Sequence, residues 1–193
     1  MNELHPTTTP TPASSSLWRT VAEVERYVAA DGWGAPLRLF ALVRTADALA
    51  RDPHLAQRLP EHVVAEAHAD PGHLTSVEQD GLPDVADLDE LLGQLAWPPG
   101  VDGAALVVER LLVPPDAEAE VRAATPAEDE EARAAALAAH PLAEEVRIAV
   151  GVLRDGGHEC AVRSRSKDSD GEVATGADLV PGLVSALQAT LQG

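Results

Sequence analysis

The sequence predicts an α+β domain with two layers: a mostly antiparallel sheet of about five strands, with helices mainly on one face. Three observations lead to this fold class. Amphipathic helical patterns open and close the chain, the predicted strands do not alternate strictly with helices, and two C-terminal strands are joined by a short glycine turn. A chain of 193 residues is long enough to bury one core of ordinary size.

A disordered segment, 1–16, is expected to precede a single domain at 17–193. Residues 5–16 are rich in Thr, Pro and Ser, and cannot bury an apolar face. The domain then begins with a helix that Ser16 is placed to cap. The apolar residues of this helix are spaced three or four apart, at Leu17, Val21, Val24 and Val28.

Shorter elements fill the rest of the chain. The predicted elements are a buried strand at 37–43, two short helices within 46–69, a weaker strand at 74–79, a helix after Asp87, a strand at 104–113, a C-terminal hairpin and a closing amphipathic helix at 179–191. The run WPPG at 97–100 ends the helix after Asp87, because proline cannot donate to the helical ladder. Trp97 is expected to pack over that helix end. It is also a candidate anchor for a partner, since an exposed Trp can contribute strongly to an interface.

Residues 114–144 are expected to form a peripheral acidic helical insertion between two strands. Thr125 is a candidate helix cap, Pro126 suits the first helical position, and four consecutive acidic residues follow at 128–131, where the helix dipole favours them. The apolar side chains of this helix are mostly Ala. The insertion can therefore add only a thin contact to the core.

The register of the C-terminal hairpin follows from parity, because a one-residue shift moves every side chain to the other face of the sheet. A two-residue loop, Gly156-Gly157, would mix valines and arginines on one face. A three-residue loop at 155–157, with Arg154 opposite His158, separates them and is preferred. One face then holds Ile148, Val150, Val152, Cys160 and Val162.

The composition excludes several classes of function. Lys and Arg number 14 against 32 Asp and Glu, which gives a net charge of −18. This charge repels phosphate backbones and anionic lipids, so neither a nucleic-acid nor a membrane partner is expected. The one cysteine, Cys160, excludes an intramolecular disulfide. The first residues lack the apolar region of a secretory signal, and a cytoplasmic location is expected.

Three patterns resemble chemical sites but lack an essential residue. His62 and Glu66 do not supply the H-E-x-x-H spacing of a zinc protease. The run 166–177 ends in Ala where a calcium loop requires a bidentate Glu. Cys160 lies among valines, where a thiol behaves as a small hydrophobe rather than a nucleophile. We therefore expect no catalytic residue, no metal and no cofactor.

Three arginines form the constellation that most resembles a binding site. Arg147, Arg163 and Arg165 are predicted to lie together on the face opposite the aliphatic one, pointing outward. Like charges side by side on a sheet are unfavourable unless an anion is near. That anion is either internal or external. Internal candidates are the acidic helix at 127–139, Glu159, and Asp168 with Asp170. External candidates are a phosphate, a carboxylate ligand or an acidic partner segment, which arginine binds through two hydrogen bonds.

The runs LAWPPGVDGAALVVERLLVPPDAEAE, HPLAEEVRIAVGVLRDGGHECAVRSRSKDSD and TGADLVPGLVSALQATL resemble an uncharacterised protein family of actinobacteria. The similarity spans most of the chain after its first residues and is densest from residue 86 onward. The resemblance implies a compact intracellular bacterial protein. It implies no activity, so no catalytic residue is carried over.

Two functions remain open at this point. The first is a non-enzymatic protein-interaction module, of the adaptor or chaperone-like kind, in which the sheet face or the acidic helix engages another protein. The second is a binding protein, or a minor enzyme, for a small anionic metabolite held by the three arginines. A pocket beside the arginines would favour the second.

Overall fold

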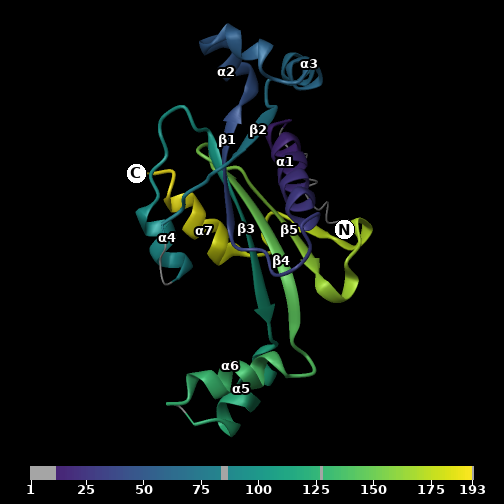
Figure 1. Cartoon of the computed structure of the whole chain (residues 1–193), viewed down its shortest axis with the longest axis vertical. Helices are drawn as coiled ribbons and strands as arrows, with labels where there is room; N and C mark the ends of the chain where they lie inside the picture. Colours follow the sequence, from purple (N-terminus) through teal and green to yellow (C-terminus); the bar gives the residue numbers. More distant parts are fainter. Residues whose placement is uncertain (1–11, 84–86, 127, 193) are drawn as a thin grey trace, which may run out of the picture.

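The computed structural model describes residues 12–83, 87–126 and 128–192 (Figure 1). Within these ranges, six strands form one antiparallel sheet in the order β2-β1-β3-β4-β5-β6. The strands are β1 (Arg38–Arg44), β2 (Leu74–Glu78), β3 (Gly103–Leu112), β4 (Glu144–Leu153), β5 (His158–Ser164) and β6 (Ala174–Gly176). The predicted α+β class and antiparallel sheet are confirmed, with six strands where about five were expected.

Seven α-helices and three short 3-10 helices accompany the sheet within the described residues. The α-helices are α1 (Pro12–Ala29), α2 (Thr45–Arg51), α3 (Glu61–Ala69), α4 (Leu88–Gln94), α5 (Pro115–Ala124), α6 (Glu130–Ala138) and α7 (Pro181–Ala189). The 3-10 helices are η1 (Pro53–Gln57), η2 (Arg165–Lys167) and η3 (Asp170–Glu172). Among the described residues, no helix combines the length and apolar character of a membrane span.

The first helix begins earlier than its apolar pattern indicates. α1 starts at Pro12, ahead of the start expected at Leu17, and proline suits the first turn because that turn needs no backbone donor. Part of the segment expected to be disordered, 12–16, is therefore helical. The rest of that segment, 1–11, lies outside the described residues.

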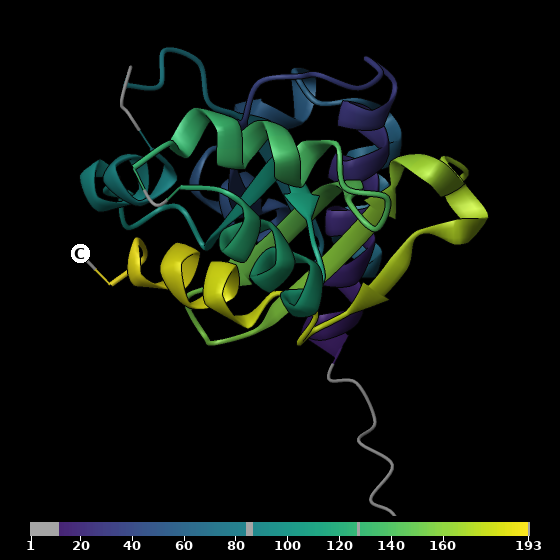
Figure 2. The same ribbon diagram turned by 90° about the horizontal axis from the view of Figure 1, so that it is seen from below.

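Helices cover both faces of the sheet, rather than mainly one as expected. α1 packs on one face through its valine stripe, whereas α4 and α7 pack on the other (Figure 2). The reason lies in β3, where Ala105 and Val107 point to the first face and Leu106 and Val108 to the second, all of them buried. A central strand that is apolar on both sides requires a cover on each side.

A glycine allows α1 to approach the sheet closely. A Cβ added at Gly151 in β4 would lie 2.4 Å from Cγ2 of Val21, a distance that side chains do not tolerate. The side chain of Val21 therefore packs directly on the backbone of β4. Because α1 lies this close to β4, the side chains between the helix and the sheet are buried.

The C-terminal hairpin keeps the predicted faces but shifts its turn. Val152 pairs with His158, and the N–H of Leu153 donates to Gly157 O, so the three-residue loop is 154–156 rather than 155–157. Arg154 lies outside the ladder: its backbone N–H donates to Asp102 O at 2.9 Å, and its guanidinium group donates to backbone carbonyls, including Val101 O at 2.8 Å. Because the parity is unchanged, the aliphatic side chains and Cys160 share one face, as predicted.

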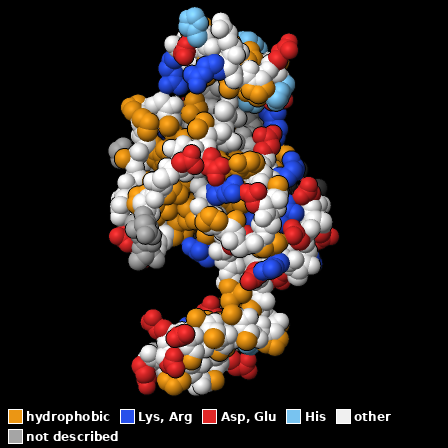
Figure 3. All heavy atoms as spheres, viewed as in Figure 1, with side chains coloured by type: hydrophobic (Ala, Val, Ile, Leu, Met, Phe, Trp, Pro, Cys, Tyr) orange, Lys and Arg blue, Asp and Glu red, His pale blue; other side chains and the backbone are white. Residues whose placement is uncertain are grey.

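The acidic insertion forms a helical arm rather than a single helix. α5 and α6 stand beyond the ends of β3 and β4, away from the rest of the molecule (Figure 1). The space-filling view shows a narrow connection between this arm and the body (Figure 3). Ala117 and Val121 are buried within the arm, whereas Leu112 and Leu142 near its base are exposed.

Candidate functional site

The three arginines do not form an open face. Arg147 and Arg163 lie beneath α1, with 0% and 3% of their surface exposed. Arg165 is the first residue of η2, after the end of β5, and is exposed. The outward placement expected for Arg147 and Arg163 is therefore corrected: small neighbours on this face, Ala149 and Ala161, leave room for α1 to pack over it.

Arg163 is paired with a buried carboxylate of α1. Its Nε and Nη2 donate to Oε1 and Oε2 of Glu25, at 2.7 and 2.8 Å. It also donates to Asp170 at 2.8 Å and to Asp168 at 3.3 Å, both in the loop after β5. The hydrogen bonds that Arg163 donates to Glu25 raise the pKa of Arg163 despite its burial. All three carboxylates therefore belong to one ion-pair cluster.

Arg147 completes this cluster on the side of β3. It donates to Glu109 at 2.8 Å and to the carbonyl of Gly32. Its guanidinium carbon lies 4.5 Å from the ring centroid of Trp33, and that of Arg165 lies 5.7 Å from the same centroid. Within the described residues, Nε and Nη1 of Arg147 have no hydrogen-bond partner. They are enclosed by protein rather than exposed in a pocket.

The cluster is thus internally paired, through carboxylates that were only partly foreseen. Asp168 and Asp170 were among the expected partners. Glu25 was not, although its position carried a signal: it lies four residues after Val21 and three before Val28, on the apolar stripe of α1. A carboxylate on a buried stripe requires a cation on the surface that the stripe covers.

Trp97 is part of the core rather than an exposed anchor. The residue is 9% exposed within the aliphatic cluster, and its Nε1 donates to Oγ1 of Thr190 at 2.9 Å. Nη2 of Arg154 donates to the carbonyl of Trp97 at 3.0 Å. The turn at 97–100 therefore ties α4, β4 and the C-terminal helix together.

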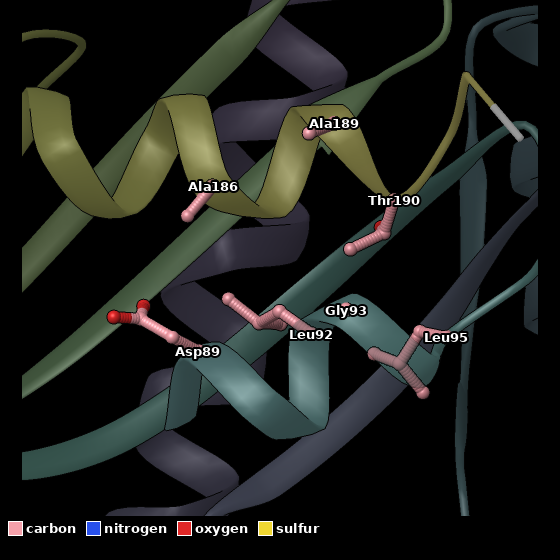
Figure 4. Close-up of a pocket in the computed structure, with 7 residues that line it drawn as sticks. All are labelled: Asp89, Leu92, Gly93, Leu95, Ala186, Ala189 and Thr190. Atoms are coloured by element: carbon pink, nitrogen blue, oxygen red, sulfur yellow. The ribbon is translucent and has the colours of Figure 1, made fainter. Parts of the chain in front are cut away.

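A cleft of about 350 Å³ lies between α4 and α7 (Figure 4). Its walls are mainly apolar, and Asp89 supplies its one carboxylate. The hydroxyl of Thr190 already donates to Leu187 O at 2.7 Å and accepts from Trp97. Among the described residues that line the cleft, there is therefore no pairing of a nucleophile with a base of the kind that covalent catalysis needs.

The other chemically suggestive residues have structural partners. Cys160 is 1% exposed, its thiol donates to Ala177 O at 3.4 Å, and burial raises its pKa. Glu66 lies 3.2 Å from Nε2 of His73 rather than beside His62 on a shared metal. Among the described residues, no group of three or more His, Cys, Asp or Glu side chains is arranged to hold a metal ion.

The free edge of β2 offers backbone hydrogen-bonding groups that β1 does not use. Thr45 N donates to His73 O at 3.0 Å, and Gln79 N donates to Leu39 O at 2.8 Å. Because hydrogen-bonded pairs alternate in an antiparallel ladder, the backbone groups of Ser76 and Glu78 face away from β1. In the described part of the chain, β2 is the last strand on this side of the sheet.

A hollow of about 310 Å³ runs beside this edge, between α1 and β2. Its lining residues are Glu23, Val24 and Tyr27 of α1, Phe40 of β1, and Ser76 and Glu78 of β2. Tyr27 is 56% exposed, packs edge-on against Phe40 with 6.3 Å between ring centroids, and donates to Oε2 of Glu78 at 3.1 Å. On the opposite face of the same strand, Val77 is 48% exposed. The edge thus has apolar surface on both sides.

A family model for PPA1309-like protein matches residues 17–192. The chain belongs to the PPA1309-like protein family. This membership confirms the resemblance to an uncharacterised family. The match includes the arginine cluster, the edge of β2 and the helical arm of this PPA1309-like chain. Neither the curated proteins nor the solved structures contain a match to it.

Proposed function

We propose that this PPA1309-like chain is a protein-interaction module that binds an extended segment of another protein as an additional strand beside β2. The observation that carries the proposal is the coincidence of two features: an open strand edge, and a hollow that contains an exposed aromatic ring directly beside it. Either feature alone is common on protein surfaces. Together they match the way in which peptide-binding domains extend a sheet.

Each feature has a separate role in this binding. The outward N–H and C=O groups of Ser76 and Glu78 supply main-chain hydrogen bonds, which give affinity without reading sequence. Side chains of an added strand alternate between the two faces. One set enters the hollow lined by Val24, Tyr27 and Phe40, and the other set contacts Val77. The hollow is the part that selects a side chain.

The charge of the chain favours a different protein over a second copy as the occupant. Two copies joined at β2 would bring together two chains of −18 each, and this repulsion opposes self-association. The opposite edge of the sheet offers less, because β6 has only three residues. We therefore assign the partner segment to β2.

A small anionic ligand has less support as an alternative. Arg147 and Arg163 would have to release Glu25, Glu109 or the loop carboxylates before binding an external anion. Arg165 is exposed, but it pairs with Glu145. The arginines stabilise the position of α1 instead.

The substitution Ser76→Pro tests strand addition. The N–H of Ser76 faces away from β1, so proline removes a donor from the free edge and leaves the β1 ladder intact. Peptides would be selected from a display library on the wild-type chain, and their affinities measured by fluorescence polarisation. We expect Ser76→Pro and Tyr27→Ala each to weaken binding about tenfold or more, a change of roughly 1.4 kcal/mol.

A second aromatic residue of α1 provides the matched control. Trp18 is 45% exposed but does not line the hollow, so Trp18→Ala should leave the affinity within about twofold. Thermal unfolding would verify that each variant folds. Selected peptides that bind Ser76→Pro as tightly as wild type would overturn the proposal, as would a selection that enriches no peptide. Self-association lost in Ser76→Pro would identify a second copy instead.

A further inference from the structure

We infer that the added strand carries a lysine or arginine on the side that faces α1, where Glu23 receives it. The inference rests on the strand addition proposed above and names the chemistry of the segment.

Glu23 is the carboxylate of this edge that is left for a partner. It is exposed on α1, and it makes no hydrogen bond or ion pair with any residue that the structure describes. Its neighbours are engaged: Glu78 accepts from Tyr27 and lies 3.5 Å from Nε of Arg38. Asp70, in the loop before β2, accepts hydrogen bonds from Arg19 at 2.5 Å and from the hydroxyl of Ser16 at 2.8 Å.

The position of Glu23 along the edge defines which peptide residue it meets. Glu23 lines the hollow beside Tyr27 and also a smaller second hollow that includes His73 and Leu74. It therefore lies between the two ends of β2. Side chains of the strand that face α1 recur every two residues, about 7 Å apart.

These positions define a short recognition pattern. An apolar side chain occupies the hollow beside Tyr27, near Glu78. A basic side chain two residues away, toward Leu74, faces Glu23. The residue between them points to the opposite face, toward Val77. The added strand therefore carries an apolar residue, then any residue, then a basic residue. These contacts place the apolar residue near Glu78 and the basic residue toward Leu74.

The expected preference is modest, because Glu23 is exposed. Exposed ion pairs change affinity by about two- to fivefold. The net charge of −18 attracts any basic peptide over a longer range, without using a particular residue. A test must therefore separate the local contribution of Glu23 from the charge of the whole chain.

The test uses two synthetic peptides with one selected sequence, differing only by Lys or Gln at the position that faces Glu23. We expect the Lys peptide to bind wild type about two- to fivefold more tightly. Glu23→Gln should remove the preference, and Glu23→Lys should reverse it toward a peptide with Glu at that position. Glu118→Gln in α5 changes the net charge equally and lies on the arm, so it should retain the preference. Raising the salt to about 1 M should remove the preference in wild type, because the Debye length falls to roughly 3 Å.

The outcomes separate this inference from the proposed function. A preference that persists unchanged in Glu23→Gln would overturn the inference. If Ser76→Pro still abolishes binding in that case, strand addition stands and only its charge selectivity is wrong. If Ser76→Pro has no effect on either peptide, the proposed function fails, and the inference fails with it.

Discussion

Arg163 of β5 and Glu25 of α1 have complementary positions between the helix and the sheet. Two guanidinium nitrogens meet two carboxylate oxygens at 2.7 and 2.8 Å, and both side chains are almost fully buried. A buried pair of this kind adds little net stability over apolar side chains, but removing one partner leaves an uncompensated charge in the interior. The pair therefore penalises any arrangement in which α1 slides along the sheet.

The substitution Arg163→Met should destabilise the fold by about 3 kcal/mol, because it removes both hydrogen bonds to the buried Glu25 and leaves this carboxylate only its longer ion pair with Arg147, at 3.9 Å. Arg165→Met is the matched control. Arg165 is exposed and pairs with Glu145 on the surface, so its loss should cost less than about 1 kcal/mol. Urea unfolding followed by circular dichroism measures both values. Equal losses in the two variants would contradict the structural role assigned to Arg163.

The sequence predicted which face of the sheet each of these side chains occupies, but not which helix packs over that face. Parity placed Cys160 and Val150 on one face and Arg147 with Arg163 on the other, as observed. Periodicity in a strand does not report which helix lies over each face. The burial of the arginines depends on α1, whose contact with β4 is allowed by Gly151. That contact joins residues far apart in the chain and has no local signature.

The helical arm projects from the rest of the fold. α5 and α6 pack against each other beyond the ends of β3 and β4, and each contributes a short helix with few large apolar side chains. The strands that carry the arm are already paired at its base, where Leu112 lies opposite Glu144. The arm therefore behaves structurally as an insertion into a long β-hairpin.

Replacing 113–143 by Asn-Gly should give a folded protein. The pairing of Leu112 with Glu144 suits a two-residue turn, which Asn-Gly favours. We expect the Tm to change by less than about 4 °C, which corresponds to roughly 1 kcal/mol. Peptide binding at β2 should be unchanged. Differential scanning calorimetry measures the Tm, and loss of the cooperative transition would show that the arm supports the body.

Long elements were predictable from sequence, whereas a very short one was not. The apolar runs at 37–43 and 104–113 predicted β1 and β3 to within a residue at each end. β6 was missed: its segment reads as a turn because three residues carry no periodic signal. Its strand geometry arises from pairing with β5, in which Gly176 lies opposite Cys160. Tertiary pairing, rather than local propensity, forms this strand.

Across the whole molecule, acidic residues outnumber basic ones, and several of them hold distant segments together. Asp70 links the loop before β2 to α1. Its pKa is lowered mainly by the hydrogen bond that it accepts from Ser16, and further by those from Gly72 and Arg19. Asp168 and Asp170 link the loop after β5 to Trp33 and Arg163, and their pKa values are lowered by those contacts. Protonation of these groups weakens links between layers rather than within a single element.

Acid should therefore destabilise the molecule in a defined range of pH. A carboxyl group whose pKa is lowered by folding contributes stability above its ordinary value, 3.8 for Asp170, and that contribution is lost as pH falls through the lower folded value. Asp170→Asn should cost more stability at pH 7 than at pH 3. Asp80→Asn, in the exposed loop after β2, provides the matched control and should show the same small effect at both. Urea unfolding at the two pH values gives the comparison; an Asp170→Asn effect that does not shrink in acid would contradict it.

The placement of Trp33 makes its fluorescence a probe of the packing between α1 and the sheet. The three indoles occupy distinct settings: Trp18 is on the surface, Trp97 is in the core, and Trp33 lies against the guanidinium groups of Arg147 and Arg165. Loosening of α1 or of the loop after β5 would change the polarity around the indole of Trp33, which also donates to Asp168 in that loop. With Trp18 and Trp97 replaced by Phe, the emission of Trp33 alone would monitor how tightly the layers are closed while a peptide is titrated at the far edge.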